Sequence, residues 1–236
     1  MKVISYSLYG NNPIYIHGAL ENCLRRDKFF RDWEIKFYIN STVPENIINE
    51  LHDRGAICIN ISDDKQFANS MWRFLPASDN NVDYFISRDC DSRLSLRDSV
   101  GVQEWIESEK DFHIIRDHPI GHSWPMNAGM WGSRGGSITN ISNLIESYIA
   151  SHPYLVSEKT IDQLFLKEII YPKAINSLLL HDEYFNYEGI GRSIKLLRSY
   201  DNYDFIGESV DENNIPRGDQ RTPIKNIFLS KQQNEN

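Results

Sequence analysis

The stretch VDYFISRDCDSR, residues 82–93, joins a short apolar segment directly to a charged one. Residues 82–87 have the branched and aromatic side chains of a buried strand, and Asp89 and Asp91 follow that strand at once. In α/β sheets, ligands bind beyond the carboxyl ends of the strands. The two aspartates are therefore predicted to lie at a binding edge, provided that the rest of the chain builds such a sheet.

Three strand–helix units precede this stretch. Strand-like segments cover 2–8, 34–39 and 56–61, and each is followed by apolar residues at helical spacing. Pro13 and Pro44 are expected to begin the first two helices, and Gly55 to end the second. The predicted core-facing residues are Ile16, Ala19, Leu20, Cys23 and Leu24 in the first helix, and Phe67, Met71 and Phe74 or Leu75 in the third.

Strands that alternate with helices need parallel crossovers. The predicted fold class is therefore α/β, with a mostly parallel central sheet and helices on both faces, in a single domain. After residue 93, Ser95 is expected to cap a helix. The remaining predictions are a strand at 112–116, a long irregular loop at 117–137, helices at 140–150 and 158–170, a strand at 174–180, a domain over 1–210 and a polar tail over 211–236 that frays at its end.

Composition excludes several classes of protein. The 236 residues contain 33 acidic and 25 basic side chains, a formal net charge of −8, so no overall positive field favours nucleic acid as a partner. The three cysteines form no C-x-x-C, which argues against a disulfide framework or a zinc–thiolate site. Neither a signal peptide nor an apolar stretch of bilayer-spanning length is recognisable. We therefore expect a cytoplasmic protein without a membrane span.

The pair Asp89 and Asp91 can be interpreted in two ways. Two carboxylates in an Asp-x-Asp segment can share one divalent cation and leave positions open for a diphosphate, or they can simply end a strand and cap the next turn. An EF-hand is excluded because the sixth and twelfth loop positions are Leu94 and Val100. No P-loop motif occurs.

Six short motifs occur in order along the chain: SLYG (7–10), MWRF (71–74), ISRDCDSR (86–93), RDHP (116–119), NAGMWG (127–132) and DQLFL (162–166). This series resembles the sugar-nucleotide glycosyltransferases of the GT-A type, in particular bacterial and viral proteins of capsule or surface-polysaccharide synthesis. The resemblance covers about 1–210 and implies the GT-A, Rossmann-like fold. In that group a first strand meets the nucleotide, an Asp-x-Asp holds manganese, and an Asp-Gln opens a helix beside the anomeric carbon.

The resemblance also implies roles for individual residues. Asp89, Asp91 and His181 would bind Mn²⁺ or Mg²⁺, while Asp162 and Gln163 would be catalytic. The Gly and Lys that follow such a histidine in the galactosyltransferases are displaced here to Gly189, Arg192 and Lys195, so a phosphate-binding role for these bases is open. The donor-binding residues would be Leu8, Tyr9, Arg73, Arg88, Asp89, Asn127, Ala128 and Gly129.

Several of these side chains also have structural interpretations. Arg88 could steady a phosphate or pair with Asp117 or Asp91, and Trp124 and Trp131 could face a sugar ring or fill the core. Arg73 could lie along Trp72 at the surface. Asp162 could serve only the first turn of a helix, where a carboxylate is favoured.

The expected activity is transfer of a sugar from a nucleoside diphosphate donor, with a UDP-sugar favoured, to a hydroxyl on a glycan or a lipid-linked acceptor. Two alternatives stay open. One is a phosphohydrolase with a D-x-D-x-[TV] motif, which is opposed by Arg93 at the last position and by the three units before Asp89. The other is a non-catalytic sugar-binding protein on the same fold.

Overall fold

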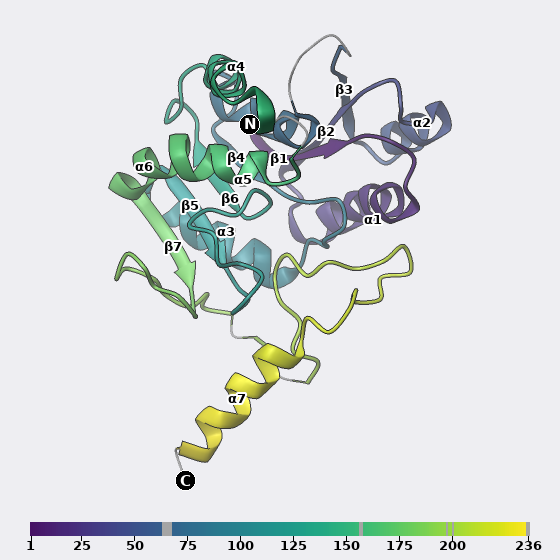
Figure 1. The fold of residues 1–236 in the computed structure, drawn as a ribbon. Helices are drawn as coiled ribbons and strands as arrows, with labels where there is room; N and C mark the ends of the chain where they lie inside the picture. Colours follow the sequence, from purple (N-terminus) through teal and green to yellow (C-terminus); the bar gives the residue numbers. More distant parts are fainter. Residues whose placement is uncertain (63–67, 156–157, 197, 200, 235–236) are drawn as a thin grey trace.

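The computed structural model describes residues 1–62, 68–155, 158–196, 198–199 and 201–234 (Figure 1). A central sheet carries helices on its two faces. Its strands are β1 (Lys2–Leu8), β2 (Trp33–Ile39), β3 (Ile57–Asn60), β4 (Tyr84–Ser87), β5 (Phe112–Arg116), β6 (Trp131–Arg134) and β7 (Leu178–Asp182).

The helical elements alternate with the strands over most of the chain. The α-helices are α1 (Pro13–Phe29), α2 (Glu45–Asp53), α3 (Leu96–Glu107), α4 (Ile141–Ser151), α5 (Ile161–Phe165), α6 (Tyr171–Ala174) and α7 (Thr222–Asn234). The chain also contains helical segments that are not α-helical. Three are 3₁₀ helices, η1 (Asn69–Ser78), η2 (Pro153–Leu155) and η4 (Ile175–Ser177), and one is a π-helical turn, η3 (Leu166–Ile170).

The described residues build a seven-stranded sheet in the order β3-β2-β1-β4-β6-β5-β7. Within it, β6 runs antiparallel to both β4 and β5, and the other pairings are parallel. The chain leaves β1 in one direction, through β2 to β3, and returns to the other side of β1 for β4. The carboxyl ends of β1 and β4 therefore flank the point where the strand order reverses, which is where open α/β sheets bind ligands. The predicted fold class is confirmed.

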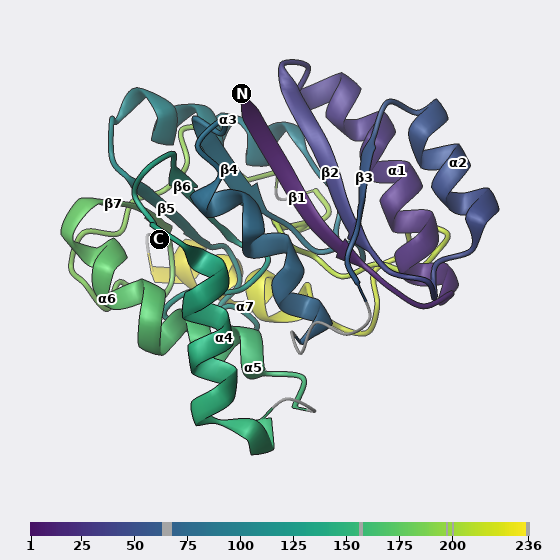
Figure 2. The ribbon, with the colours of Figure 1, turned by 90° about the horizontal axis from the view of Figure 1, so that it is seen from above.

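Each face of the sheet has its own hydrophobic core. One core joins β1 and β2 to α1, α2 and α3 through side chains such as Ile35, Leu51 and Trp105. The other joins β4 and β5 to η1, α4 and α5 through Phe74, Phe85 and others. Figure 2 shows the two helical layers on opposite sides of the strands. This two-sided burial explains why β2 is buried at almost every position instead of alternating as its sequence suggests.

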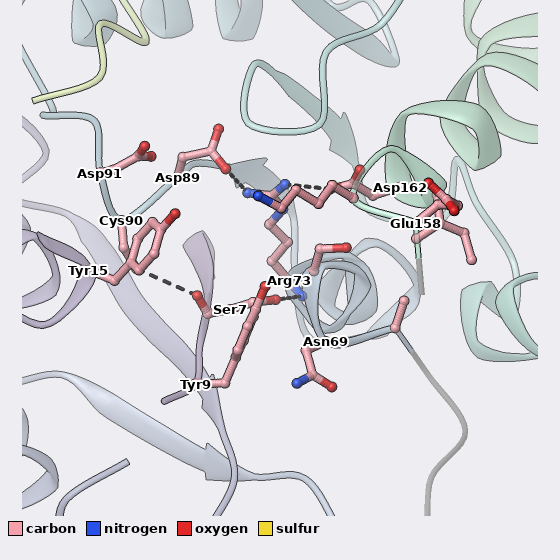
Figure 3. A pocket seen from close by; sticks show the side chains of 14 residues that line it. Ser7, Tyr9, Tyr15, Asn69, Arg73, Asp89, Cys90, Asp91, Glu158 and Asp162 are labelled. Carbon is pink, nitrogen blue, oxygen red and sulfur yellow. Dashed lines mark hydrogen bonds and ion pairs between the residues drawn. The ribbon is translucent and has the colours of Figure 1, made fainter. Parts of the chain in front are cut away.

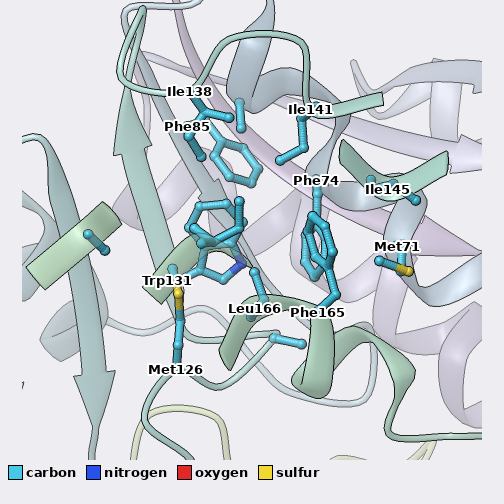
Figure 4. Packing of buried hydrophobic residues seen from close by; sticks show 14 of the residues in the cluster. Met71, Phe74, Phe85, Met126, Trp131, Ile138, Ile141, Ile145, Phe165 and Leu166 are labelled. Carbon is cyan, nitrogen blue, oxygen red and sulfur yellow. The ribbon is translucent and has the colours of Figure 1, made fainter. Parts of the chain in front are cut away.

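Strand β6 corrects the prediction of an unbroken irregular loop over 117–137. Trp131 is fully buried, with its ring 5.0 Å from that of Phe85 and 5.4 Å from that of Phe74, so the core-filling interpretation of this tryptophan is right (Figure 4). A Cβ on Gly132 would lie 2.5 Å from the carbonyl oxygen of Phe85. The strand forms because β4 pairs with it on one side and β5 on the other. The four-residue segment WGSR has no sequence pattern that predicts this pairing.

Three further predictions differ from the structure, and one lies outside the described residues. Leu24, expected in the core, is 51% exposed because α1 turns that position toward solvent. The third helix is the 3₁₀ segment η1, with Pro76 inside it. The last strand, β7, lies four residues later than its predicted start, and helical turns occupy 174–177. Phe67 lies outside the described residues.

The C-terminal segment is more ordered than a polar tail. Residues 205–221 pack back against the loop after β4, and α7 then projects from the body of the molecule (Figure 1). Ile224 anchors α7, being 2% exposed. The predicted boundary at residue 210 falls inside this packed segment. None of the helices in the described ranges combines the length and the apolar character that crossing a bilayer requires.

A buried ion pair ties β4 to α3. Arg88 donates from Nε to Asp98 Oδ2 at 2.9 Å and from Nη2 to Asp98 Oδ1 at 2.7 Å, and both side chains are almost fully buried. Ser95 caps the same helix, as predicted, by accepting from the backbone N–H of Asp98. A buried pair of this kind is costly to break because the remaining charge is left without a partner.

Replacement of the buried carboxylate should therefore destabilise the fold. Asp98→Asn is expected to lower the free energy of unfolding by about 3 kcal/mol, measured by urea denaturation. Asp83→Asn, which removes an exposed carboxylate that pairs with the N-terminus, is the control and should cost less than about 1 kcal/mol. Equal losses in the two variants would contradict the assignment of Arg88 and Asp98 as a structural pair.

Candidate functional site

A cleft of about 650 Å³ opens at the carboxyl ends of β1 and β4, at the reversal of the strand order (Figure 3). Both aspartates of the Asp-x-Asp segment line it, as do Arg73 and Asp162. The lining residues are Ser7, Tyr9, Tyr15, Ala68, Asn69, Ser70, Arg73, Asp89, Cys90, Asp91, Glu158, Lys159, Ile161 and Asp162.

The C-terminal segment holds Asp91 in place. The backbone N–H of Val210 donates to the Asp91 carbonyl at 2.8 Å, and the Ser209 hydroxyl donates to Asp91 Oδ2 at 2.9 Å. Arg217, whose side chain is 47% exposed, lies 3.8 Å from the same oxygen. Burial, together with the nearby charge of Asp89, raises the pKa of the Asp91 carboxyl. The two carboxylates therefore repel each other across a short loop.

Two glycines allow the loop after β4 to sit where it does. A Cβ on Gly18, in α1, would lie 1.7 Å from the Cys90 carbonyl oxygen. A Cβ on Gly129 would lie 1.8 Å from Asp89 Oδ2. Gly129, predicted to bind the donor, thus lies directly against the Asp89 carboxylate. Real Cβ atoms do not approach other atoms so closely. Gly18 faces backbone and requires glycine, whereas a side chain at Gly129 would force the Asp89 carboxylate to move.

Arg73 joins the two acidic sides of the cleft. Its guanidinium donates to Asp89 Oδ1 and, at 2.9 Å, to Asp162 Oδ2 (Figure 3). Its backbone N–H donates to the Ser7 hydroxyl at 3.0 Å, which fixes η1 to the end of β1. Burial favours the neutral form of the guanidinium, but Asp89 and Asp162 outweigh that effect and raise the pKa of Arg73. The interpretation of Arg73 as a surface residue is wrong, because it is 6% exposed.

Asp162 and Gln163 begin α5 on the opposite side of the cleft from β1. Asp162 is 5% exposed, and burial raises the pKa of its carboxyl against the opposing effect of Arg73. Gln163 does not line the cleft. Its Oε1 accepts from the backbone N–H of Ala128 at 3.0 Å, so Gln163 holds the 127–129 segment against α5.

The other predicted donor-binding residues divide into two groups. Tyr9 lines the cleft, 42% exposed, with its ring edge-on to Trp72 at 5.9 Å. Leu8, Asn127 and Ala128 are buried and do not line it. Leu8 packs in the core beside α1. The Asn127 amide donates to the carbonyl of His122 at 3.3 Å. The Ala128 carbonyl accepts from the Ser87 hydroxyl at 2.7 Å.

Arg88 also lies away from the cleft. The sequence suggested Asp117 or Asp91 as its ion-pair partner, but Arg88 pairs with Asp98. Asp117 pairs instead with Arg97 and Arg198.

His181 belongs to a second buried cluster, on β5, β7 and α3. Its Nδ1 lies 2.8 Å from His113 Nε2, and its Nε2 lies 3.6 Å from Glu104 Oε2. Arg192 and the backbone of Lys195 approach the same glutamate. Among the residues that the structure describes, no group of three or more His, Cys, Asp or Glu side chains is arranged to hold a metal. The structure thus does not bring His181 together with Asp89 and Asp91.

Sequence reasoning missed Ser7, Tyr15, Asn69, Ser209 and Arg217. Ser7 and Tyr15 could have been found, because they lie at the end of the first predicted strand and in the first turn of the next helix, on the binding edge of the sheet. Ser209 and Arg217 could not, because they lie in a polar segment that carries no periodic signal.

No family model matches the chain, and no curated protein matches it either. Solved structures similar to it include S. aureus TarS in complex with UDP-GlcNAc, at 12% identity and a TM-score of 0.46 over 76% of this chain and 56% of that one. Another is a mannosyltransferase from Pyrobaculum calidifontis in complex with GDP-Man and Mn²⁺, at 12% identity and a TM-score of 0.41 over 62% and 45%. A third is the galactosyltransferase LgtC in complex with donor and acceptor sugar analogues, at 11% identity and a TM-score of 0.43 over 76% and 84%.

These similarities concern the fold alone. The chain spans 58% of the length of a further TarS structure, that of its residues 1–349.

The histidine cluster should make stability depend on pH. Burial lowers the pKa of His181 to about 4 and also lowers that of His113. Histidines in the unfolded chain take up protons below about pH 6.5, whereas the folded cluster does not. Stability should therefore be complete above pH 6.5 and fall as the pH drops toward 4, by about 1.4 kcal/mol per pH unit for each histidine.

Urea denaturation at pH 7.5, 6 and 5 measures this dependence. His113→Gln is expected to make the decline between pH 6.5 and 5 shallower without abolishing it, because burial also lowers the pKa of His181 and of His122 to about 4. His17→Gln, at an exposed position of α1, should leave the decline unchanged. A decline of the same slope in His113→Gln would show that other groups cause it.

The close approach of Gly129 to Asp89 can be tested by a double-mutant cycle. Gly129→Ala should lower the free energy of unfolding by about 1–3 kcal/mol, because the new methyl group collides with the carboxylate. In an Asp89→Ala background the same substitution should cost much less, because the colliding group is gone. The same cost in both backgrounds would mean that Gly129 is required for another reason.

Proposed function

We propose that this chain is a metal-dependent glycosyltransferase. It would move a sugar from a nucleoside diphosphate donor, with a UDP-sugar expected, to a hydroxyl of a glycan or lipid-linked acceptor in surface glycan or polysaccharide synthesis. The observation that carries the proposal is the placement of Asp89 and Asp91, which line the cleft at the strand-order reversal and share it with Arg73 and Asp162. The ordered motifs that resemble GT-A enzymes support the same conclusion.

The residues present fit a divalent cation, either Mn²⁺ or Mg²⁺. Carboxylate oxygens are the ligands that hard cations prefer. Burial and then the charge of Asp89 raise the pKa of Asp91, and a cation between the two carboxylates would relieve their repulsion. Asp89 and Asp91 would hold the ion, and donor phosphate and water would complete its shell. When bound, it would neutralise charge on the departing diphosphate.

Cationic side chains would also stabilise the negative charge on the departing diphosphate. Arg217 is half-exposed and lies beside Asp91, so its guanidinium is free to turn toward a diphosphate in the cleft. This makes Arg217 a better candidate for the phosphate-binding base than Arg192 or Lys195, which approach Glu104 in the histidine cluster. Preorganised cations of this kind stabilise charge that develops on a leaving group.

The remaining cleft residues suggest how a donor would lie. Tyr9 and Tyr15 present partly exposed rings at the β1 side, suited to stacking on a nucleoside, and the Asn69 amide lies at the same wall. Asp162, at the α5 side, is the carboxylate proposed to act near the reacting carbon of the sugar. Gln163 would support it indirectly, by holding the 127–129 segment, which contacts Asp89 through Gly129, against α5.

A phosphohydrolase is less well supported. Its nucleophilic aspartate would follow the first strand, whereas Asp89 follows β4, and Arg93 stands at the Thr or Val position and donates to the carbonyls of Cys90 and Asp211. A non-catalytic sugar-binding protein would use the same cleft without turnover. One assay separates the three functions.

That assay incubates the chain with Mn²⁺ and a panel of nucleotide sugars and follows the release of nucleoside diphosphate. The proposal predicts slow release from at least one donor, accelerated by an acceptor sugar. Phosphate release from monoesters would favour the phosphohydrolase. Sugar binding without either release would favour the non-catalytic protein.

Asp91→Asn should reduce this nucleoside diphosphate release by about a hundredfold or more, because one of two proposed cation ligands is lost. The melting temperature should be unchanged or slightly higher, because the substitution removes a buried charge whose pKa is raised. Asp53→Asn, at an exposed position of α2, is the control for the loss of one negative charge. A large fall in melting temperature would make Asp91 a structural residue instead.

A further inference from the structure

Arg73 occupies an unusual electrostatic position. It is a buried cation on η1 that contacts one carboxylate from the Asp-x-Asp loop, Asp89, and one from α5, Asp162. Its third guanidinium contact is the Arg88 carbonyl, at 3.3 Å. Its Nε–H has no hydrogen-bond acceptor among the described residues. The guanidinium is thus held mainly by two negative charges and retains one unsatisfied donor.

The Asp89 carboxylate pairs with Arg73 and is also a proposed ligand of the divalent cation. Its Oδ1 accepts from Arg73, its Oδ2 faces Gly129, and 43% of the side chain is exposed to the cleft. A cation bound between Asp89 and Asp91 would draw on the same carboxylate that Arg73 now neutralises. Two cations that depend on one carboxylate weaken each other, since each reduces the negative charge available to the other.

We infer that Arg73 is an internal counter-ion that competes with the divalent cation for Asp89, and that it makes cation and nucleotide diphosphate bind cooperatively. The inference rests on the proposed function and concerns the regulation of that same site. Without ligand, the bridge from Asp89 through Arg73 to Asp162 holds the acidic cleft together. A cation alone must displace Arg73 from Asp89 and leave the buried guanidinium with Asp162 as its one carboxylate.

A diphosphate removes that penalty. Its oxygens provide the acceptors that Arg73 loses when Asp89 turns to the cation, and the free Nε–H gives the guanidinium a further donor for them. The nucleotide should therefore tighten cation binding, and by linkage the cation should tighten nucleotide binding by the same factor. Arg73 acts here as a positioning residue for Asp89.

The test measures Mn²⁺ affinity of the full chain by electron paramagnetic resonance, with and without UDP. For the wild-type chain, UDP should tighten Mn²⁺ binding about tenfold, the effect of one charge-assisted hydrogen bond. Arg73→Lys keeps the charge but has a point-like ammonium in place of the fork that bridges two carboxylates. It should bind Mn²⁺ alone about tenfold more tightly than the wild type. UDP should tighten its Mn²⁺ binding by a smaller factor than in the wild type, because only direct coordination of the ion by the diphosphate then couples the two ligands.

Two further variants make the result specific. Lys159→Gln removes a cation that lines the same cleft and that forms no ion pair with Asp89 in the part of the chain that the structure describes. It should therefore leave the affinity for Mn²⁺ alone close to that of the wild type. If Arg73→Lys does not fold, Arg73→Met combined with Asp162→Asn removes the buried cation together with one of its carboxylates and should also tighten Mn²⁺ binding. Melting curves establish that each variant is folded.

The outcomes separate this inference from the proposed function. Mn²⁺ binding of equal strength in the wild type and Arg73→Lys, with the same effect of UDP, would overturn the counter-ion role and leave the metal site standing. An equal gain in Lys159→Gln would also overturn it, because general charge and not the bridge would then set the affinity. No Mn²⁺ binding in any variant, with or without UDP, would overturn both proposals.

Discussion

The candidate site depends on one ionic interaction, the bridge that Arg73 forms between Asp89 and Asp162. These residues come from η1, the loop after β4 and α5, which are far apart in the sequence. The sheet brings them together because β1 and β4 are neighbours and η1 packs across both. The positive charge of the buried Arg73 guanidinium compensates the repulsion between the Asp89 and Asp162 carboxylates. A strongly acidic cleft is therefore compatible with a stable fold.

The loop that carries the aspartates is shaped by what surrounds it. Gly18 and Gly129 leave room for its backbone and for the Asp89 carboxylate, and the segment through Ser209 and Val210 closes over Asp91. These contacts leave Asp89 and Asp91 on one side, facing the cleft (Figure 3). Packing within the chain thus sets the positions of both aspartates at the cleft.

The sequence predicted those features that have a local cause. Strand and helix periodicity predicted the strand–helix units up to β4. The position of Asp89 and Asp91 directly after a strand predicted that they lie at the binding edge of the sheet. It could not predict β6, whose WGSR segment is a strand because two neighbours pair with it, or the roles of Ser209 and Arg217, which follow from a chain return across more than a hundred residues. His181 shows the opposite error: a residue suited to metal by type lies in another cluster, with His113 and Glu104.

The most direct test of the account is a crystal structure of the chain with UDP and Mn²⁺, using the anomalous signal of manganese to locate the ion. The account predicts the ion bound by oxygens of both Asp89 and Asp91 and by the diphosphate, in the cleft beyond β1 and β4. An ion and nucleotide bound elsewhere, with Asp89 still paired to Arg73, would contradict it.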